Sequence, residues 1–288
     1  MVLDLYISNN CNLNCNFCYL KNHKSVPINY KKLIDIIYNL NPEKILFIAK
    51  EPLLGDLDKI LFIMDKFPNK KYILYSNLTL KLTNKMIEII KRCEHLTTSF
   101  DVKYRFKNVK NLNKWIHNVK YIKKYNINNE IEVLITTTDE AIKIKPEKYV
   151  KMFKKLDISY YGLSMLSRPD ELMDKKIDSY SNSKLFKWLR EFFIQENSEH
   201  LILSVFENTI KRSRQYLSIN NECEIIDPLN RKKDIIPNSS IPYLKCLKCE
   251  FYKPCGGLNS NSSRCVFNID LYNLGKRILK ERNFKYEL

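Results

Sequence analysis

The stretch Cys11-Asn12-Leu13-Asn14-Cys15-Asn16-Phe17-Cys18-Tyr19 places three thiols within eight residues near the start of the chain. The residues before it, Val2-Leu3-Asp4-Leu5-Tyr6-Ile7, alternate apolar and mixed side chains and predict a short buried strand. The cysteines therefore lie on the loop at the carboxyl end of that strand, where α/β folds commonly carry their chemistry. Thiolates bind iron–sulfur clusters or zinc, and three ligands leave one coordination position open.

The spacing of these cysteines, with Phe17 just before the last one, resembles the cluster loop of the radical SAM superfamily. The resemblance implies that Cys11, Cys15 and Cys18 hold a four-iron four-sulfur (4Fe-4S) cluster whose fourth iron is chelated by S-adenosylmethionine (AdoMet). In that family an electron from the cluster cleaves AdoMet to a 5′-deoxyadenosyl radical, which abstracts a hydrogen atom from the substrate. The alternatives are a zinc site, with His23 as a fourth ligand, or cysteines of the core.

Helical and strand patterns alternate after this loop, which predicts a parallel α/β sheet with right-handed crossovers. The expected strands span residues 44–48, 71–75, 95–100, 131–136 and 158–164, and the expected helices 30–40, 57–67, 82–92, 111–125, 146–156 and 184–197. A strand at 201–206 and a short helix at 207–212 would end the domain near residue 212. The resemblance selects a partial, six-stranded TIM-type β/α barrel over residues 1–212.

Polar residues follow several of these strands, at the end where barrel enzymes carry their sites. Ala49-Lys50-Glu51-Pro52 resembles the Gly-Gly-Glu-Pro motif that holds the methionyl amino group of AdoMet, with Ala49 and Lys50 in place of the glycines. The alternative for Glu51 is that it begins a turn, which Pro52 favours.

The next two strands end in Ser76-Asn77 and in Ser99-Phe100-Asp101, which are similar to the Ser-Asn-Gly and Ser-Ile-Asp patterns of the family. The resemblance implies that Ser76, Asn77, Ser99 and Asp101 face the ribose and carboxylate of AdoMet, and Phe17 is counted with them. The fifth strand ends in Thr136-Thr137-Thr138-Asp139, which lines the pocket or, as we prefer, caps the next helix.

A second group of cysteines has the spacing Cys246-x2-Cys249-x5-Cys255-x9-Cys265. It resembles part of the SPASM domain, a module that binds auxiliary iron–sulfur clusters, and implies one auxiliary 4Fe-4S cluster in a small cysteine-rich domain at 213–288. A zinc ribbon with the same four ligands is the alternative.

Two cysteines belong to neither group. Cys93 lies in the apolar pattern of a helix and is expected in the core. Cys223 precedes a predicted strand and has three alternatives: a structural thiol, a further metal ligand, or a hydrogen-atom donor that quenches a substrate radical.

The composition bears on the cellular compartment and on the partners of the protein. The chain has 288 residues, a formal net charge of +17 and nine cysteines, and its odd, clustered cysteines favour a reducing, cytoplasmic compartment over a disulfide framework. We expect neither a signal peptide nor a membrane span, and no glycine-rich phosphate loop occurs. The positive charge fits nucleic acid or an acidic peptide, although the lysines are scattered through predicted helices.

Proteins that combine these two modules usually act on peptides, so the resemblance implies modification of a ribosomally made peptide or protein by epimerisation, crosslinking or oxidation. Its partners would be that substrate and an electron donor such as flavodoxin or ferredoxin. The alternatives are a radical SAM dehydrogenase or rearrangement enzyme on a small molecule, and an RNA-modifying enzyme.

Overall fold

The computed structural model describes residues 2–18, 29–127, 130–164, 182–202, 216–219, 225–226 and 269–284. By contact density the chain divides into two compact units, residues 1–133 with 215–233 and residues 134–214 with 234–288. His23, Cys223 and the four cysteines expected at an auxiliary site lie outside the described residues, so the predictions for them stay predictions.

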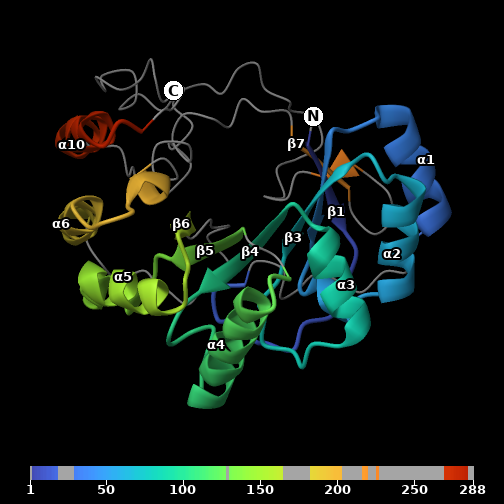
Figure 1. Ribbon diagram of the computed structural model, residues 1–288, viewed down its shortest axis with the longest axis horizontal. Helices are drawn as coiled ribbons and strands as arrows, with labels where there is room; N and C mark the ends of the chain where they lie inside the picture. The colour runs from blue at the N-terminus through green and yellow to red at the C-terminus, as the bar shows by residue number, and fades with distance from the viewer. Residues whose placement is uncertain are drawn as a thin grey trace. The chain divides into compact units, whose positions relative to one another are not determined.

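The first unit alternates strands and helices in the predicted order (Figure 1). Its elements are β1 (Val2–Tyr6), α1 (Tyr30–Leu40), β2 (Lys44–Ile48), η1 (Pro52–Leu54), α2 (Leu57–Lys66), β3 (Lys71–Tyr75), α3 (Asn84–Arg92), β4 (His95–Phe100), α4 (Val109–Lys124), β7 (Tyr216–Ile219) and β8 (Ile225–Ile226). The short strand β5 (Ile131–Thr136) runs from this unit into the second.

The strands are hydrogen-bonded in the order β6-β5-β4-β3-β2-β1-β7-β8. The first six strands therefore follow one another in space as they do in sequence, with β1 to β4 paired in parallel. When each new strand is added at the same edge of the sheet through a right-handed crossover, all the helices lie on one face. This is the arrangement of a partial TIM-type barrel. The predicted fold class is confirmed.

The strand register assigns each side chain to a face of the sheet. Leu5, Phe47 and Leu74 are register partners across β1, β2 and β3, and all three are fully buried. The helices cover this face: the Tyr72 hydroxyl donates to the carbonyl of Phe67, just after α2, at 2.8 Å. On β4 the same face holds Thr98, whose hydroxyl accepts from the indole N–H of Trp115 in α4.

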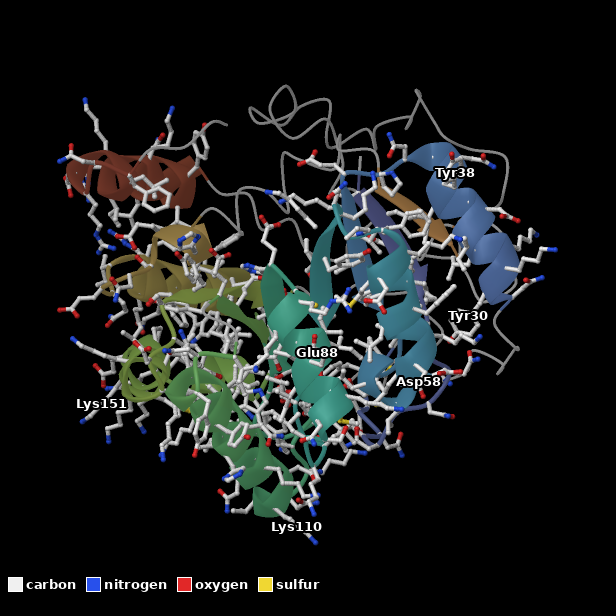
Figure 2. The ribbon with its side chains drawn as sticks, turned by 45° about the vertical axis from the view of Figure 1, so that its right-hand side comes forward. Tyr30, Tyr38, Asp58, Glu88, Lys110 and Lys151 are labelled. Atoms are coloured by element: carbon white, nitrogen blue, oxygen red, sulfur yellow. The ribbon has the colours of Figure 1, made fainter. Side chains whose placement is uncertain are left out.

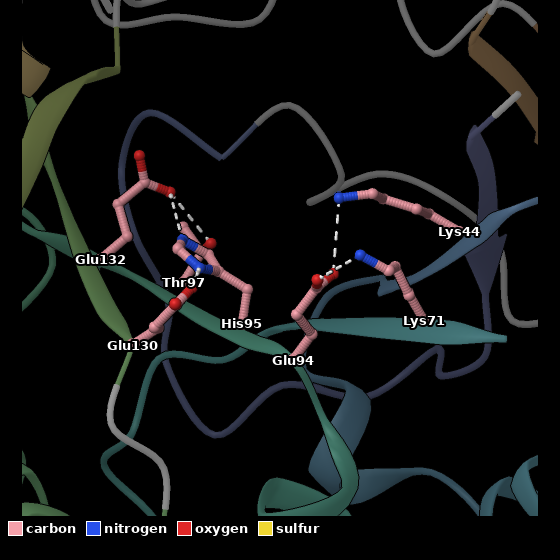
Figure 3. A network of polar contacts seen from close by, with 7 residues as sticks. All are labelled: Lys44, Lys71, Glu94, His95, Thr97, Glu130 and Glu132. Atoms are coloured by element: carbon pink, nitrogen blue, oxygen red, sulfur yellow. Dashed lines mark hydrogen bonds and ion pairs between the residues drawn. The ribbon is translucent and has the colours of Figure 1, made fainter. Parts of the chain in front are cut away.

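The opposite face carries polar residues at the amino ends of the strands (Figure 3). His95 Nδ1 lies 3.0 Å from Glu130 Oε2, and its Nε2 lies 3.7 Å from Glu132 Oε2, which also accepts from the Thr97 hydroxyl at 3.0 Å. Beside them Glu94 pairs with Lys71 at 2.8 Å and with Lys44 at 3.4 Å. This network lies at the end of the strands away from the cysteine loop.

The second unit comprises η2 (Ala141–Lys143), α5 (Pro146–Lys155), β6 (Tyr160–Ser164), α6 (Asn182–Phe193) and α10 (Ile269–Glu281). Its core is aromatic, with Tyr149, Phe153, Tyr161, Trp188 and Phe192 in mutual ring contact. The Thr138 hydroxyl accepts from the Ala141 N–H at 3.1 Å, at the start of η2. The helix expected next, α5, begins without a side-chain cap, so the preferred role of the polar stretch as its cap is wrong.

Two features differ from the sequence-based expectation. Residues 201–202, expected to begin a strand, are helical and continue the turn that starts at residue 199. Strand β7, from the expected C-terminal domain, pairs with β1 in parallel, because the open edge of β1 offers unpaired backbone groups. In the described part of the chain, no helix combines the length and apolar character that a bilayer span requires.

Candidate functional site

The cysteine loop leaves β1 at its carboxyl end, as predicted. Cys11 is exposed, Cys15 is buried and Cys18 is half-buried. The loop forms a turn in which the Cys18 N–H donates to the carbonyl of Cys15 at 3.3 Å, and the Leu13 N–H donates to Cys11 Sγ at 3.4 Å. The three thiols are thus presented by one short turn, with an amide already directed at one sulfur.

Asn77, at the end of β3, joins this loop to the next parts of the site. Its amide Nδ2 donates to Asn12 Oδ1 at 2.9 Å and lies 3.7 Å from Cys11 Sγ. Asn12 in turn donates to the Thr79 hydroxyl at 2.7 Å. Hydrogen bonds to a cluster's sulfur ligands tune its potential, so Asn77 has the position of such a donor.

Glu51 joins the ends of β2 and β3. Its carboxylate is fully buried and accepts from the Ser76 hydroxyl at 2.9 Å, the Asn77 N–H at 2.8 Å and the Leu53 N–H at 3.2 Å. Burial raises the pKa of Glu51, and these three hydrogen bonds oppose that increase. Because its side chain caps η1 at Leu53, Glu51 does begin a turn. Its predicted contact with the methionyl amino group stays a prediction.

The close approach of backbone at this site occurs at Gly55. A Cβ atom there would lie 2.6 Å from the Ile7 carbonyl oxygen and 3.0 Å from that of Pro52. Only a residue without a side chain fits this contact. The loop after β2 therefore contacts the segment that leads into the cysteine loop, and it does so at a glycine three residues after Pro52, the end of the motif in which Ala49 and Lys50 replace the expected glycines.

The loop after β3 is held in an uncommon backbone conformation. Leu78 has φ +51°, in the left-handed region, and its side chain is buried. The amide of Asn118, in α4, donates to the carbonyls of Leu78 and Leu80 at 2.8 and 2.7 Å. Sequence analysis missed Asn118, because one asparagine within a helical pattern carries no signal of such a contact.

The loop after β4 is organised by Asp101. Its Oδ1 atom accepts from the backbone N–H groups of Lys103 and Arg105, both at 3.1 Å, and from that of Tyr104. The carboxylate is buried, so these bonds fix the loop. The predicted contact of Asp101 with AdoMet stays a prediction, as does that of Ser99, which is half-buried on the polar face at the end of β4.

Arg105, which sequence analysis did not predict, is the cation of the site. Its guanidinium carbon lies 5.5 Å from the centroid of the Phe17 ring, within the range of a cation–π contact. Its Nε is buried and has no hydrogen-bond partner among the described residues. The charge of Arg105 lowers the pKa of Cys15, although burial, the larger effect, raises it. A buried donor without a partner fits an anionic ligand.

Zinc and an iron–sulfur cluster require different arrangements of the side chains that bind them. Among the described residues no three His, Cys, Asp or Glu side chains converge on one ion. A tetrahedral zinc site needs such convergence, with each donor about 2.0–2.3 Å from the metal. A four-iron cluster takes one thiolate per iron, so its ligands surround it. The three cysteines and the Asn77 amide are donors of the kind that a four-iron cluster takes, so the described residues of the loop fit one.

Comparisons with known proteins bear on the fold. No protein-family model matches the sequence, and no curated protein sequence matches it. Among solved structures, "Native anSMEcpe with bound AdoMet" has a TM-score of 0.69 at 15% identity, covering 98% of this chain and 96% of that one. The same protein "with bound AdoMet and Cp18Cys peptide" has a TM-score of 0.68 at 14% identity, with the same coverage.

A third structure, Streptococcus suis SuiB, has a TM-score of 0.61 at 16% identity, covering 88% of this chain and 71% of that one. The titles of the first two structures name bound AdoMet, and the chain shares the fold of all three.

Proposed function

We propose that the protein is a radical SAM enzyme whose cluster is bound by Cys11, Cys15 and Cys18. The observation that carries the proposal is that the cysteine loop meets the polar ends of β2 and β3 through Asn77, near the half-buried Arg105, whose Nε is buried. When bound, the cluster supplies the electron that cleaves AdoMet to a 5′-deoxyadenosyl radical.

The residues of the chain have separate tasks in this proposal. Burial raises the pKa of Cys11 and Cys15, so both thiols keep their protons at neutral pH until iron displaces them. Arg105 would offer its unpartnered Nε–H to the AdoMet carboxylate, and the Phe17 ring centroid lies 5.5 Å from the same guanidinium. Glu51 keeps Asn77 in place through its backbone N–H.

For the substrate we infer a ribosomally made peptide or protein. Supporting this inference, a structure that covers nearly the whole chain at the same fold carries a peptide together with AdoMet. Hydrogen abstraction from the peptide would lead to epimerisation, crosslinking or oxidation. An auxiliary cluster at Cys246, Cys249, Cys255 and Cys265 would favour the last two, and hydrogen donation by Cys223 would favour the first.

The first experiment measures metals and AdoMet cleavage. Protein reconstituted anaerobically would be analysed for iron, sulfide and zinc, and for 5′-deoxyadenosine after reduction, alongside the triple Cys11/Cys15/Cys18→Ala variant. We expect about eight irons in the wild type and about four in the variant, which should release no 5′-deoxyadenosine. About four irons with one zinc would make the second site structural. A reconstituted wild type without iron or 5′-deoxyadenosine would refute the proposal.

The substrate class needs its own measurement. A peptide encoded beside the gene, deuterated at its Cα positions, would be incubated with enzyme, AdoMet and reductant. Deuterium in 5′-deoxyadenosine, detected by mass spectrometry, is the expected result, since the radical takes its hydrogen from the substrate. Cleavage of AdoMet without deuterium transfer from any candidate peptide would point to the small-molecule or RNA alternatives.

A further inference from the structure

The loop after β4 and helix α4 form the most one-sidedly charged segment of the chain. Residues 102–129 contain no Asp or Glu but eight cations: Lys103, Arg105, Lys107, Lys110, Lys114, Lys120, Lys123 and Lys124. About a tenth of the sequence thus carries about half of the net charge of +17. Genome-wide drift toward lysine does not explain this imbalance, because it would not remove acidic residues from one segment.

Three exposed lysines at the amino end of α4, Lys107, Lys110 and Lys114, form what we call the lysine face. Within the described residues none of them has an ion pair, whereas Lys85 pairs with Asp58 and Arg92 with Asp65 on neighbouring helices. Lys110 lies in the first turn of α4, which contains no acidic residue. Because the helix dipole is positive there, this charge opposes helix stability, so the fold gains nothing from it.

The lysine face lies next to the candidate site. Arg105, over the Phe17 ring, is two residues before Lys107, and two residues of extended chain span about 7 Å at most. Figure 2 shows Lys110 at the amino end of α4 with its side chain pointing away from the sheet. A protein that covers these lysines would therefore bring a redox group close to the cysteine loop.

We propose that the lysine face is the docking surface for a small acidic electron-carrier protein of the flavodoxin or ferredoxin class, an inference that rests on the proposed function. The carrier would give up one electron, the site would accept it, and no covalent bond would change. Electron-transfer encounters are held by small interfaces and depend on charge complementarity for their rate of formation. An acidic carrier fits a surface of unpaired lysines beside the site it must reduce.

The chemistry of the surface favours this partner over RNA. Single-stranded nucleic acid is gripped by cations together with exposed aromatic rings on which bases stack. The exposed ring nearest α4 is Tyr125, the residue that ends the helix at its opposite end, where it lies tilted against Tyr121. The lysine face itself offers charge without a ring, which suits carboxylates.

The test uses the full, reconstituted chain with two electron sources. One variant, K107E/K110E/K114E, reverses the lysine face, and a matched variant, K120E/K123E/K124E, makes the same charge change about 15 Å further along α4. Release of 5′-deoxyadenosine would be measured with dithionite, and with a bacterial flavodoxin reduced by its NADPH-dependent reductase. The flavodoxin rates would be repeated at several salt concentrations, because charge-driven docking weakens as salt rises.

We expect the first variant to lose about tenfold or more of its flavodoxin-driven rate while the matched variant changes less than about twofold. With dithionite both variants should equal the wild type, which also shows that they fold. Equal losses in the two variants, or none in the first, would overturn the proposal. Loss of binding to a labelled oligoribonucleotide in the first variant, with its flavodoxin rate intact, would also overturn it and assign the surface to RNA. Failure of the wild type with dithionite would instead refute the proposed function.

Discussion

The guanidinium carbon of Arg105 lies 5.5 Å from the centroid of the Phe17 ring, and the Nε beside it is buried without a partner among the described residues. A charge-assisted hydrogen bond contributes roughly 1.5–3 kcal/mol. We therefore predict that Arg105→Met weakens AdoMet binding by about tenfold to a hundredfold, and Arg105→Lys by less. Equilibrium dialysis of labelled AdoMet measures this directly. Arg92→Met, which removes the half-buried partner of Asp65 on α3, is the control, and an unchanged affinity in Arg105→Met would contradict the role.

Asp101 should act through its loop. Asp101→Ala removes the acceptor of three partly buried backbone N–H groups and should lower the free energy of unfolding by about 1–3 kcal/mol, measured by urea denaturation. Asp101→Asn keeps one acceptor oxygen and should cost less. If the carboxylate instead bound AdoMet directly, both variants would lose affinity equally while their stability stayed near that of the wild type.

Gly55 allows the segments after β1 and β2 to touch. Gly55→Ala would place a Cβ atom 2.6 Å from the Ile7 carbonyl, so one backbone segment must move. We expect a loss of about 1–3 kcal/mol in the free energy of unfolding, the range for overpacked sites. Iron content after reconstitution should fall as well, because Ile7 leads into the cysteine loop. A variant with normal stability and iron content would show that this contact is dispensable.

The His95 network should make stability depend on pH. Burial lowers the pKa of His95, but hydrogen bonds and charges from Glu132 and Glu130 together raise it above its usual 6.5. A raised pKa means that protonated His95 stabilises the fold fully below the unfolded-state value, and that this contribution disappears as pH rises through the folded-state value.

Urea denaturation of the wild type and of His95→Gln across the pH range upward from 6 tests this expectation. The wild type should lose about 1 kcal/mol more than the variant over that range. Glu94, whose hydrogen bond with Lys71 lowers its pKa, stays charged throughout and does not disturb the comparison. Parallel curves for the two proteins would mean that His95 is not linked to folding.

The strands of the sheet could be predicted from the sequence because the alternation of apolar and polar side chains along a strand is a local property. The strands at 44–48, 71–75, 95–100 and 131–136 have their predicted bounds, and Cys93 is buried in the core. The cysteine loop and the polar strand ends were also found, because parallel strands bring their carboxyl ends together at one edge.

The rest of the site depends on contacts between segments far apart in sequence. Arg105 reaches Phe17 only because Asp101 folds the intervening loop back, and nothing in the spacing of these residues indicates this. Asn118 donates to the carbonyls of Leu78 and Leu80, which lie 40 and 38 residues earlier in the sequence. Strand β7 pairs with β1 although about 210 residues separate the two strands in sequence, so a local pattern could not predict this pairing.

Leu78 restricts what can replace it. Its left-handed backbone excludes side chains branched at Cβ, while its buried position excludes charged ones. Glycine would relieve the backbone strain but would lose the buried apolar side chain. Asparagine adopts the left-handed conformation readily, but its side chain is polar. A saturation library at this codon should therefore retain few residues, with leucine and methionine foremost and valine, isoleucine and threonine absent. The backbone and the packing would therefore conserve this position in such a screen, although it is not one of the proposed cluster ligands.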